Sequence, residues 1–194
     1  RRSSDLKRDI MAEEYKEMIQ NWNTESKEGV DILADKYGNP DEITNSQVIW
    51  YNNGPWAKTV VYEARDDHHF PMKHTDFVEQ SIFYYVTPDK FTELAEFDGS
   101  VTCKRTAGMI SAKCHDEEAN FLALNLAHDI NTNKKTVEEA RNYYVQAMKD
   151  YRAKKDVPYM QSLQFEPLKK QESQYLDQEL VKKEELDEIE ESNK

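Results

Sequence analysis

Cysteine and long apolar runs are scarce in this 194-residue sequence. With only two cysteines, it leaves the redox compartment of the protein open. Apolar residues make up 38% of the chain and charged residues 33%, and the mean hydropathy is −0.95, so part of the chain must be solvated rather than packed in a core. No apolar run approaches the roughly 18 residues that a membrane-spanning helix needs. We therefore expect a soluble chain without a transmembrane segment.

Positive charge is also in deficit. The chain has 26 Lys and Arg against 38 Asp and Glu, which gives a formal net charge of −12. Phosphate backbones and anionic lipid head groups repel such a chain. We therefore expect protein partners and no nucleic acid.

The motifs of the common catalytic folds are absent as well. The sequence has no GxxxxGK[ST] phosphate loop, no GxGxxG fingerprint, no HExxH zinc motif, no GxSxG elbow and no pair of CxxC motifs. This absence favours a non-catalytic role, although it leaves open an enzyme with a less common site.

Two helices are predicted at the start of the chain. From Ser4 to Trp22, apolar residues recur every three or four positions, which predicts an amphipathic helix that needs a partner surface. A second helix can begin at Thr24 or Ser26, and Gly38 and Pro40 predict its end, because glycine adopts the left-handed cap and proline blocks continuation.

The middle of the chain predicts an antiparallel sheet of about five strands packed on helices, an α+β fold. Turn residues lie between β-rich runs, as expected for hairpins, and capping residues precede two apolar helices. The expected strands are 48–51, 56–63, 79–86, 100–105 and 109–114; the expected helices are a short one ending at Phe97, one capped by Asp116, and one opened by a capping box of Thr136 with Glu139.

The end of the chain loses this pattern. Residues 157–168 read as an extended strap that can lie in an apolar groove, and residues 169–194 as a frayed acidic helix or a disordered tail. The predicted organisation is therefore an N-terminal docking helix (1–23), an α+β domain (24–156), and a strap with an acidic tail (157–194).

Exposed aromatic and apolar side chains are the predicted interaction surface. Aromatic residues on both faces of the strands indicate that one face is covered by helices and the other by the strap or by a partner, two alternatives that the sequence leaves equal. The side chains expected to contact a partner are Met18, Trp22, Trp50, Trp56, Tyr159 and Phe165.

The one chemical site that the sequence suggests is a polar loop over residues 65–77. It holds His68, His74 and Asp76, which are ligand types for zinc or another divalent transition metal. Pro71 restricts the backbone between the two histidines and can turn their rings toward each other. The alternative is a solvated loop whose histidines bind nothing. In a catalytic site, Glu63 and Arg65 would be the acid, base or anion clamp.

Two further groups of residues are interpreted as structural. We expect Asn120, Asn125 and His128 to form hydrogen bonds with the sheet or a neighbouring loop rather than to perform chemistry. Cys103 and Cys114 lie on the two arms of one predicted hairpin, so a disulfide is conceivable if the register places them opposite each other.

One segment resembles a known family. Residues 36–44, Lys-Tyr-Gly-Asn-Pro-Asp-Glu-Ile-Thr, followed by Val48-Ile49-Trp50-Tyr51, resemble the helix, Gly-x-Pro stop and first strand of small bacterial envelope lipoproteins of the BamE/SmpA type. Residues 50–56, 69–71 and 119–129 look like segments of exported bacterial proteins with no assigned activity. The resemblance implies a two-layer α+β domain, a removed signal and a lipid anchor upstream, and a place in the bacterial cell envelope, with the cytoplasm as the alternative.

Two hypotheses of function follow. The first is a non-catalytic accessory protein, an envelope lipoprotein or a subunit of a larger assembly, that docks through its terminal extensions. The second is a metal-assisted enzyme or small-ligand-binding protein with its site on residues 65–77.

Overall fold

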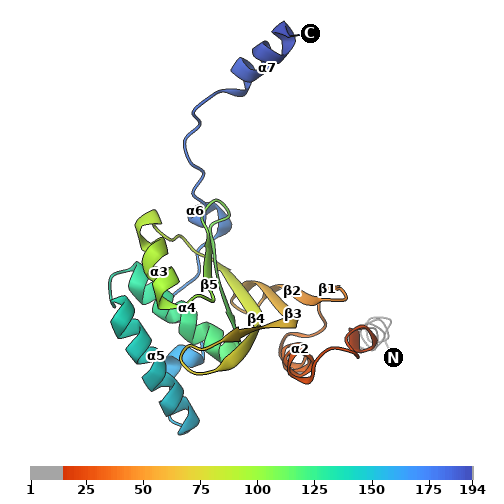
Figure 1. Cartoon of the computed structure of the whole chain (residues 1–194), viewed down its shortest axis with the longest axis vertical. Helices are drawn as coiled ribbons and strands as arrows, with labels where there is room; N and C mark the ends of the chain where they lie inside the picture. The colour runs from red at the N-terminus through yellow and green to blue at the C-terminus, as the bar shows by residue number, and fades with distance from the viewer. Residues whose placement is uncertain (1–14, 194) are drawn as a thin grey trace.

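The computed structural model describes residues 15–193 and has an α+β fold, as predicted (Figure 1). Six strands form one antiparallel sheet in the order β1-β2-β3-β4-β6-β5. The count exceeds the expected five because a two-residue strand pairs at the edge. The strands are β1 (Glu42–Ile43), β2 (Gln47–Asn53), β3 (Trp56–His68), β4 (His74–Phe83), β5 (Val101–Lys104) and β6 (Met109–Cys114).

Helices pack on this sheet in two groups. The helices are α2 (Thr24–Tyr37), α3 (Phe91–Phe97), α4 (Glu117–Asn131), α5 (Val137–Arg152), α6 (Lys170–Ser173) and α7 (Lys183–Ser192). Helix α2 packs on β3 and β4, whereas α4 packs on β4, β5 and β6 and α5 packs on α3 and α4 (Figure 1). Val78 and Gln80 are two residues apart on β4 and so share a face; Val78 packs in the cluster under α2, and Gln80 is bonded to α4. The helices α2 and α4 therefore lie side by side over one face.

The helix ends follow the capping residues in the sequence. The side chain of Asn23 accepts a hydrogen bond from the Ser26 amide at the start of α2, and Gly38 ends that helix with φ 85°. Thr136 and Glu139 form the predicted capping box of α5. These satisfied terminal groups explain why the helix boundaries could be predicted closely. None of the helices in residues 15–193 has the length and apolar character needed to cross a membrane.

Three tryptophans lie in the core instead of on a docking surface. Trp22, Trp50 and Trp56 are only 5%, 2% and 1% exposed. Their indole nitrogens donate to Asn45 O, Gly38 O and Glu117 Oε1, so their polar groups are satisfied inside the domain. This placement corrects the expectation that these three side chains are available to a partner.

The N-terminal segment is described from Tyr15 onward, and the rest of the predicted docking helix lies outside the described residues. Tyr15, Ile19 and Trp22 are buried in the same cluster as α2 and β2–β4, whereas Met18 is 44% exposed. Residues 15–22 therefore complete the core of the chain itself, and of the residues predicted here for docking only Met18 stays on the surface.

The strap, residues 157–168, covers the core of its own domain. The sequence left this arrangement and coverage by a partner as equal alternatives. Val157 and Met160 are buried, and the Phe165 ring stacks on that of His128 at a centroid distance of 4.2 Å. The Leu168 amide donates to Phe83 O at the end of β4. Tyr159 and Phe165 are packed against the main core cluster, so both predicted contact residues are engaged within the chain.

The hydrogen bonds expected of Asn120, Asn125 and His128 are present. Asn120 Nδ2 donates to Val78 O and Gln80 Oε1 in the sheet. His128 Nδ1 is 2.8 Å from the Tyr84 hydroxyl.

Asn125 fixes the strap. Its Nδ2 donates to Tyr159 O and Ser162 O, and its Oδ1 accepts a bond from the Gln164 amide. We expect Asn125→Leu to lower the free energy of unfolding by about 1–3 kcal/mol, because the strap backbone loses its buried partners. Chemical denaturation measures the loss, and hydrogen exchange of the Gln164 amide should rise most. Unchanged stability and exchange would contradict this role.

The two cysteines are free thiols in an arrangement that does not favour a bridge. Cys103 lies opposite Ile110, and Cys114 lies opposite Val78 of the other neighbouring strand. The register therefore does not place the two cysteines opposite each other.

Candidate functional site

The end of the β3–β4 hairpin replaces most of the predicted loop. β3 continues to His68 and β4 begins at His74, so only residues 69–73 connect them, and the prediction of a loop over 65–77 is wrong. A register shift between Val61 and Asp66 lets the strands continue pairing beyond the sheet. Backbone pairing needs no apolar side chain, which is why this polar extension has no strand signal in the sequence.

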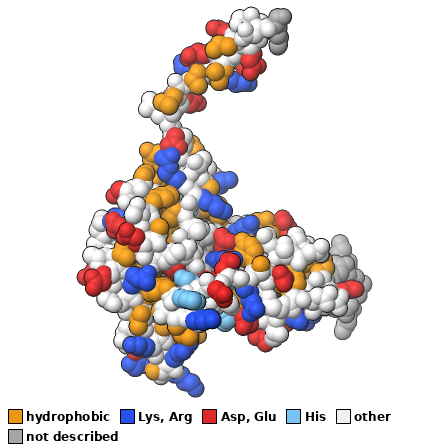
Figure 2. All heavy atoms as spheres, in the orientation of Figure 1, with side chains coloured by type: hydrophobic (Ala, Val, Ile, Leu, Met, Phe, Trp, Pro, Cys, Tyr) orange, Lys and Arg blue, Asp and Glu red, His pale blue; other side chains and the backbone are white. Residues whose placement is uncertain are grey.

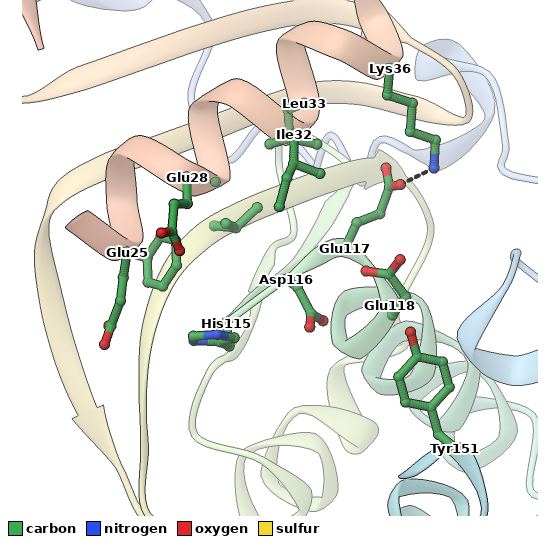
Figure 3. A pocket seen from close by; sticks show the side chains of 13 residues that line it. Glu25, Glu28, Ile32, Leu33, Lys36, His115, Asp116, Glu117, Glu118 and Tyr151 are labelled. Atoms are coloured by element: carbon green, nitrogen blue, oxygen red, sulfur yellow. Dashed lines mark hydrogen bonds and ion pairs between the residues drawn. The ribbon is translucent and has the colours of Figure 1, made fainter. Parts of the chain in front are cut away.

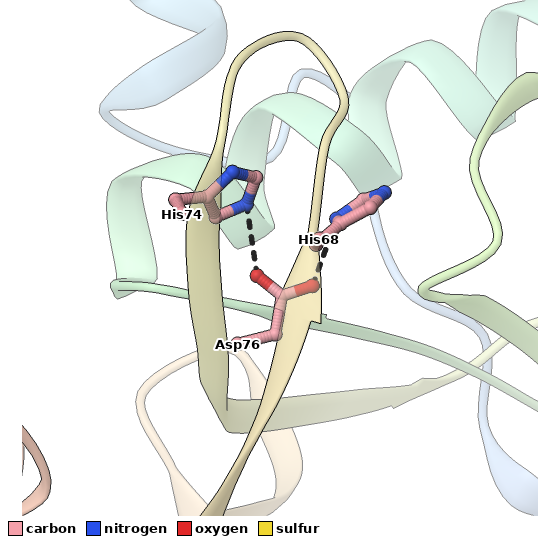
Figure 4. A group of neighbouring side chains, drawn as sticks. All are labelled: His68, His74 and Asp76. Atoms are coloured by element: carbon pink, nitrogen blue, oxygen red, sulfur yellow. Dashed lines mark ion pairs between the residues drawn. The ribbon is translucent and has the colours of Figure 1, made fainter.

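This pairing brings together the three residues predicted as metal ligands. His68 lies directly opposite His74, and Asp76 follows two residues later on the same face of β4 (Figure 4). His68 Nδ1 is 2.8 Å from Asp76 Oδ2, and His74 Nε2 is 2.9 Å from Asp76 Oδ1. One potential ligand atom from each of the three side chains lies within 4.8 Å of the others.

The proton on His74 can be placed from its partners. Its Nδ1 is 2.7 Å from Met72 O, and a carbonyl oxygen only accepts, so Nδ1 carries a hydrogen and donates it. In a neutral ring, Nε2 is then a bare lone pair that faces a carboxylate oxygen at 2.9 Å. Asp76 Oδ1 is buried, and this ring nitrogen is its polar partner among the described residues. A hydrogen on the ring or on the carboxyl group, or a metal ion, must therefore lie between these two atoms.

A second carboxylate adds to the negative charge. Asp76 and Asp98 are 1% and 2% exposed, and no Lys or Arg among residues 15–193 forms an ion pair with either. Burial raises the pKa of Asp98, and the charge of Asp76 raises it further, against the opposing effects of the Ser100 amide and His68. Two buried carboxylates beside two neutral imidazoles would leave two uncompensated charges, which is costly and which a divalent cation would balance.

The connection between α3 and β5 holds the carboxylates in place. The Ser100 hydroxyl donates to Asp76 Oδ2 at 2.6 Å, and the Ser100 amide donates to Asp98 Oδ1 at 2.8 Å. Asp98 Oδ1 also lies 3.7 Å from His68 Nε2. Asp98 and Ser100 carry no site signal in the sequence, because an Asp-Gly-Ser turn after a helix is an ordinary helix end and only the fold brings it to the hairpin.

Packing fixes the short loop as well. The peptide bond between Phe70 and Pro71 is cis. The Phe70 ring packs against Tyr144 and Phe97, and the Arg141 guanidinium lies 3.9 Å from its centroid. The His68 and His74 rings are 5.0 Å apart, side by side as the sequence suggested.

The other two residues proposed for chemistry are not in this cluster. Arg65 forms an ion pair with Glu25, and the Glu63 carbonyl accepts a bond from Asn23. No ion pair or hydrogen bond joins either residue to the histidines within the described part of the chain. The structure therefore gives no support to an acid, base or anion-clamp role for them.

Two cavities flank the segment His115–Asp116. The larger, about 330 Å³, lies between α2 and the start of α4 (Figure 3). Three of its carboxylates are engaged in the fold: Glu25 with Arg65, Asp116 as the cap of α4, and Glu117 with Lys36. The smaller, about 250 Å³, is bordered by His74 and by residues of α4 and α5. His74 thus belongs both to the metal-ligand cluster and to a cavity wall.

Comparisons of this chain with protein-family models, with curated proteins and with solved structures find no match. The function must therefore be argued from the geometry of the site.

Proposed function

We propose that this protein binds a divalent transition-metal ion, with zinc as the first choice, through His68, His74 and Asp76. The observation that carries the proposal is the 2.9 Å contact between His74 Nε2 and the buried Asp76 Oδ1, because in a neutral ring and an ionised carboxylate both atoms present electron pairs that a metal ion would accept. Two imidazoles and one carboxylate are an ordinary donor set for zinc and for non-haem iron.

The surroundings of the three ligands favour this proposal. A metal-bound histidine commonly donates its other ring nitrogen to a carbonyl oxygen, which is the bond from His74 to Met72. Ser100 orients the Asp76 carboxylate in the same way. Both histidine side chains retain about 20% exposure, so solvent or a ligand can reach the site. Three protein ligands leave a coordination position for a bound molecule, as in metal-assisted enzymes.

Zinc titration of metal-free protein tests the proposal. We expect one zinc ion per chain, and at least a 100-fold loss of affinity in His68→Ala/His74→Ala, because even second-shell changes at metal sites cost about 10–100-fold. His69→Ala/His115→Ala is the matched control, since it removes two exposed histidines outside the cluster. Equally weak binding by all three proteins would reject the metal site.

A second function, as an accessory subunit, is supported by α7. This helix stands apart from the domain at the end of an extended segment (Figures 1 and 2). None of its residues is buried, and Leu186 and Ile189 are 48% and 58% exposed. Six of its ten residues are acidic. We propose that α7 docks on a protein with an apolar groove edged by Lys and Arg. The resemblance of residues 36–51 to BamE/SmpA lipoproteins favours the bacterial envelope as the location of this assembly.

The isolated chain offers a first test of this second function. We expect the amides of α7 to exchange nearly as fast as in an unfolded peptide, because a ten-residue helix without packing is marginal in water. The amides of α4 serve as the protected reference. Strong protection of α7 in a monodisperse monomer would mean that the helix needs no partner. Recovery of the native complex should then depend on Leu186 and Ile189.

A further inference from the structure

We propose that the 250 Å³ cavity beside His74 binds a small carboxylate with an apolar tail, with Arg152 as the anchor of its carboxylate group. The inference deepens the proposed metal function, because it assigns a ligand class to the cavity next to a metal-ligating histidine. The cavity and Arg152 are observed independently of the metal.

The cavity wall is mainly apolar. Met72 and Pro71 come from the hairpin loop, Ala119 from α4, Met148 from α5, and Met160 from the strap. Methionine side chains are unbranched and adaptable, so they fit flexible apolar ligands. Four separate segments of the chain therefore converge on one apolar surface.

Arg152 differs from the other described arginines in having no oxygen partner. Arg65 and Arg105 form ion pairs with carboxylates, and Arg141 donates to the carbonyls of Glu96 and Phe97. Within residues 15–193, the Arg152 guanidinium instead contacts Met72 Sδ, at 3.2 Å. It borders the cavity in the last turn of α5, and its planar fork matches a carboxylate.

Three other polar side chains of the wall contact the surrounding fold. Asp116 Oδ1 accepts the Ala119 amide as the cap of α4, and His115 Nδ1 is 3.3 Å from Thr75 O. Tyr144 is 3% exposed and packs on Phe70. The exposed Tyr151 adds a hydroxyl group to the wall, and Arg152 is its cation without a carboxylate partner in the described part of the chain, which favours an anion over an amine.

The size of the cavity limits its occupant. A volume of about 250 Å³ equals roughly eight water molecules in the liquid. It admits an aliphatic or single-ring acid and excludes a dinucleotide or a fused-ring cofactor. Figure 2 shows histidine side chains at the surface of the domain with basic and apolar side chains beside them. The His74 side chain is 20% exposed, so a ligand can approach it from solvent.

Calorimetry with octanoate, 1-octanol and octylamine tests the inference, first on metal-free and then on zinc-loaded protein. We expect octanoate to bind at least tenfold more tightly than octanol, and Arg152→Gln to remove about tenfold of octanoate affinity alone, since a hydrogen bond to a charged group contributes about 1.5–3 kcal/mol. Met148→Trp should fill the cavity and abolish binding of both. Arg105→Gln, outside the cavity, is the matched control.

Several outcomes would overturn the inference: equal binding of octanoate and octanol, tighter binding of octylamine, no effect of Arg152→Gln, or an equal effect of Arg105→Gln. Arg152 is an exposed residue, so its variant should remain folded even if Met148→Trp does not. Octanoate binding to the metal-free protein without zinc binding would reject the metal function alone. Zinc binding without octanoate binding would reject the cavity inference alone.

Discussion

Replacing Glu117 with alanine is expected to lower the free energy of unfolding by about 3–5 kcal/mol, because each buried donor that loses its partner costs about 1–3 kcal/mol. Glu117 is 6% exposed at the start of α4. Its Oε1 accepts bonds from Tyr37, Trp56 and Gln80, and its Oε2 pairs with Lys36. One carboxylate thus joins α4 to α2, β3 and β4, and its loss leaves the buried donors of Trp56 and Gln80 without their acceptor.

Acid should weaken this junction. Burial opposes the ionisation of Glu117, but the bonds from Lys36, Tyr37, Trp56 and Gln80 outweigh it and lower the pKa below the usual value. The folded state therefore favours the ionised form, so its contribution is complete above the unfolded pKa and is lost as the pH falls through the lowered folded pKa. Glu117→Gln should reduce the dependence of the unfolding free energy on pH in this acidic range.

Urea denaturation at several pH values measures both effects, with Glu118→Ala as the control. Burial and the neighbouring Asp116 and Glu117 raise the pKa of Glu118, so its charge is unfavourable in the folded state. Removing Glu118 should leave stability at pH 7 unchanged or slightly higher. An equal loss of unfolding free energy in Glu117→Ala and Glu118→Ala would show that the hydrogen bonds of Glu117 contribute no additional stability.

The elements of this fold could be predicted where local chemistry determines them. The stop at Gly38, the capping box of Thr136 and the two hairpins depend on neighbouring residues, so they appear in the sequence. The tryptophans could not be assigned in the same way. A large aromatic side chain carries the same signal in a core and at an interface, and only the packing of α2 and α4 decides that Trp50 and Trp56 are buried.

The candidate site was predictable in part for the same reason. Composition alone identified His68, His74 and Asp76, because three suitable ligands occur within nine residues. Their geometry depends on the extension of the β3–β4 hairpin to His68 and His74. This extension could not be predicted, because its residues are polar and lack the apolar alternation of a strand. Asp98 and Ser100 lie in the connection between α3 and β5, more than twenty residues after Asp76 in the sequence. Their contact with the histidine cluster therefore could not be predicted from sequence proximity.

Asp76→Asn is expected to separate the stability of the fold from metal binding. In the presence of a chelator, the variant should be as stable as the wild type or more stable. An amide nitrogen in place of Oδ1 can donate to the bare His74 Nε2, and the remaining oxygen can still accept from Ser100. The change also removes one of two neighbouring buried carboxylates.

In the presence of zinc, the wild type should instead be more stable than Asp76→Asn. At a free concentration 1,000 times its dissociation constant, zinc adds about 4.1 kcal/mol to the wild type, or about 8–16 °C in melting temperature at 2–4 °C per kcal/mol. A 100-fold weaker site gains only about 1.4 kcal/mol at that concentration. Thermal melts of both proteins, with chelator and with zinc, give the comparison. If Asp76→Asn were destabilised equally in both conditions, Asp76 would be a structural residue of the hairpin and not a metal ligand.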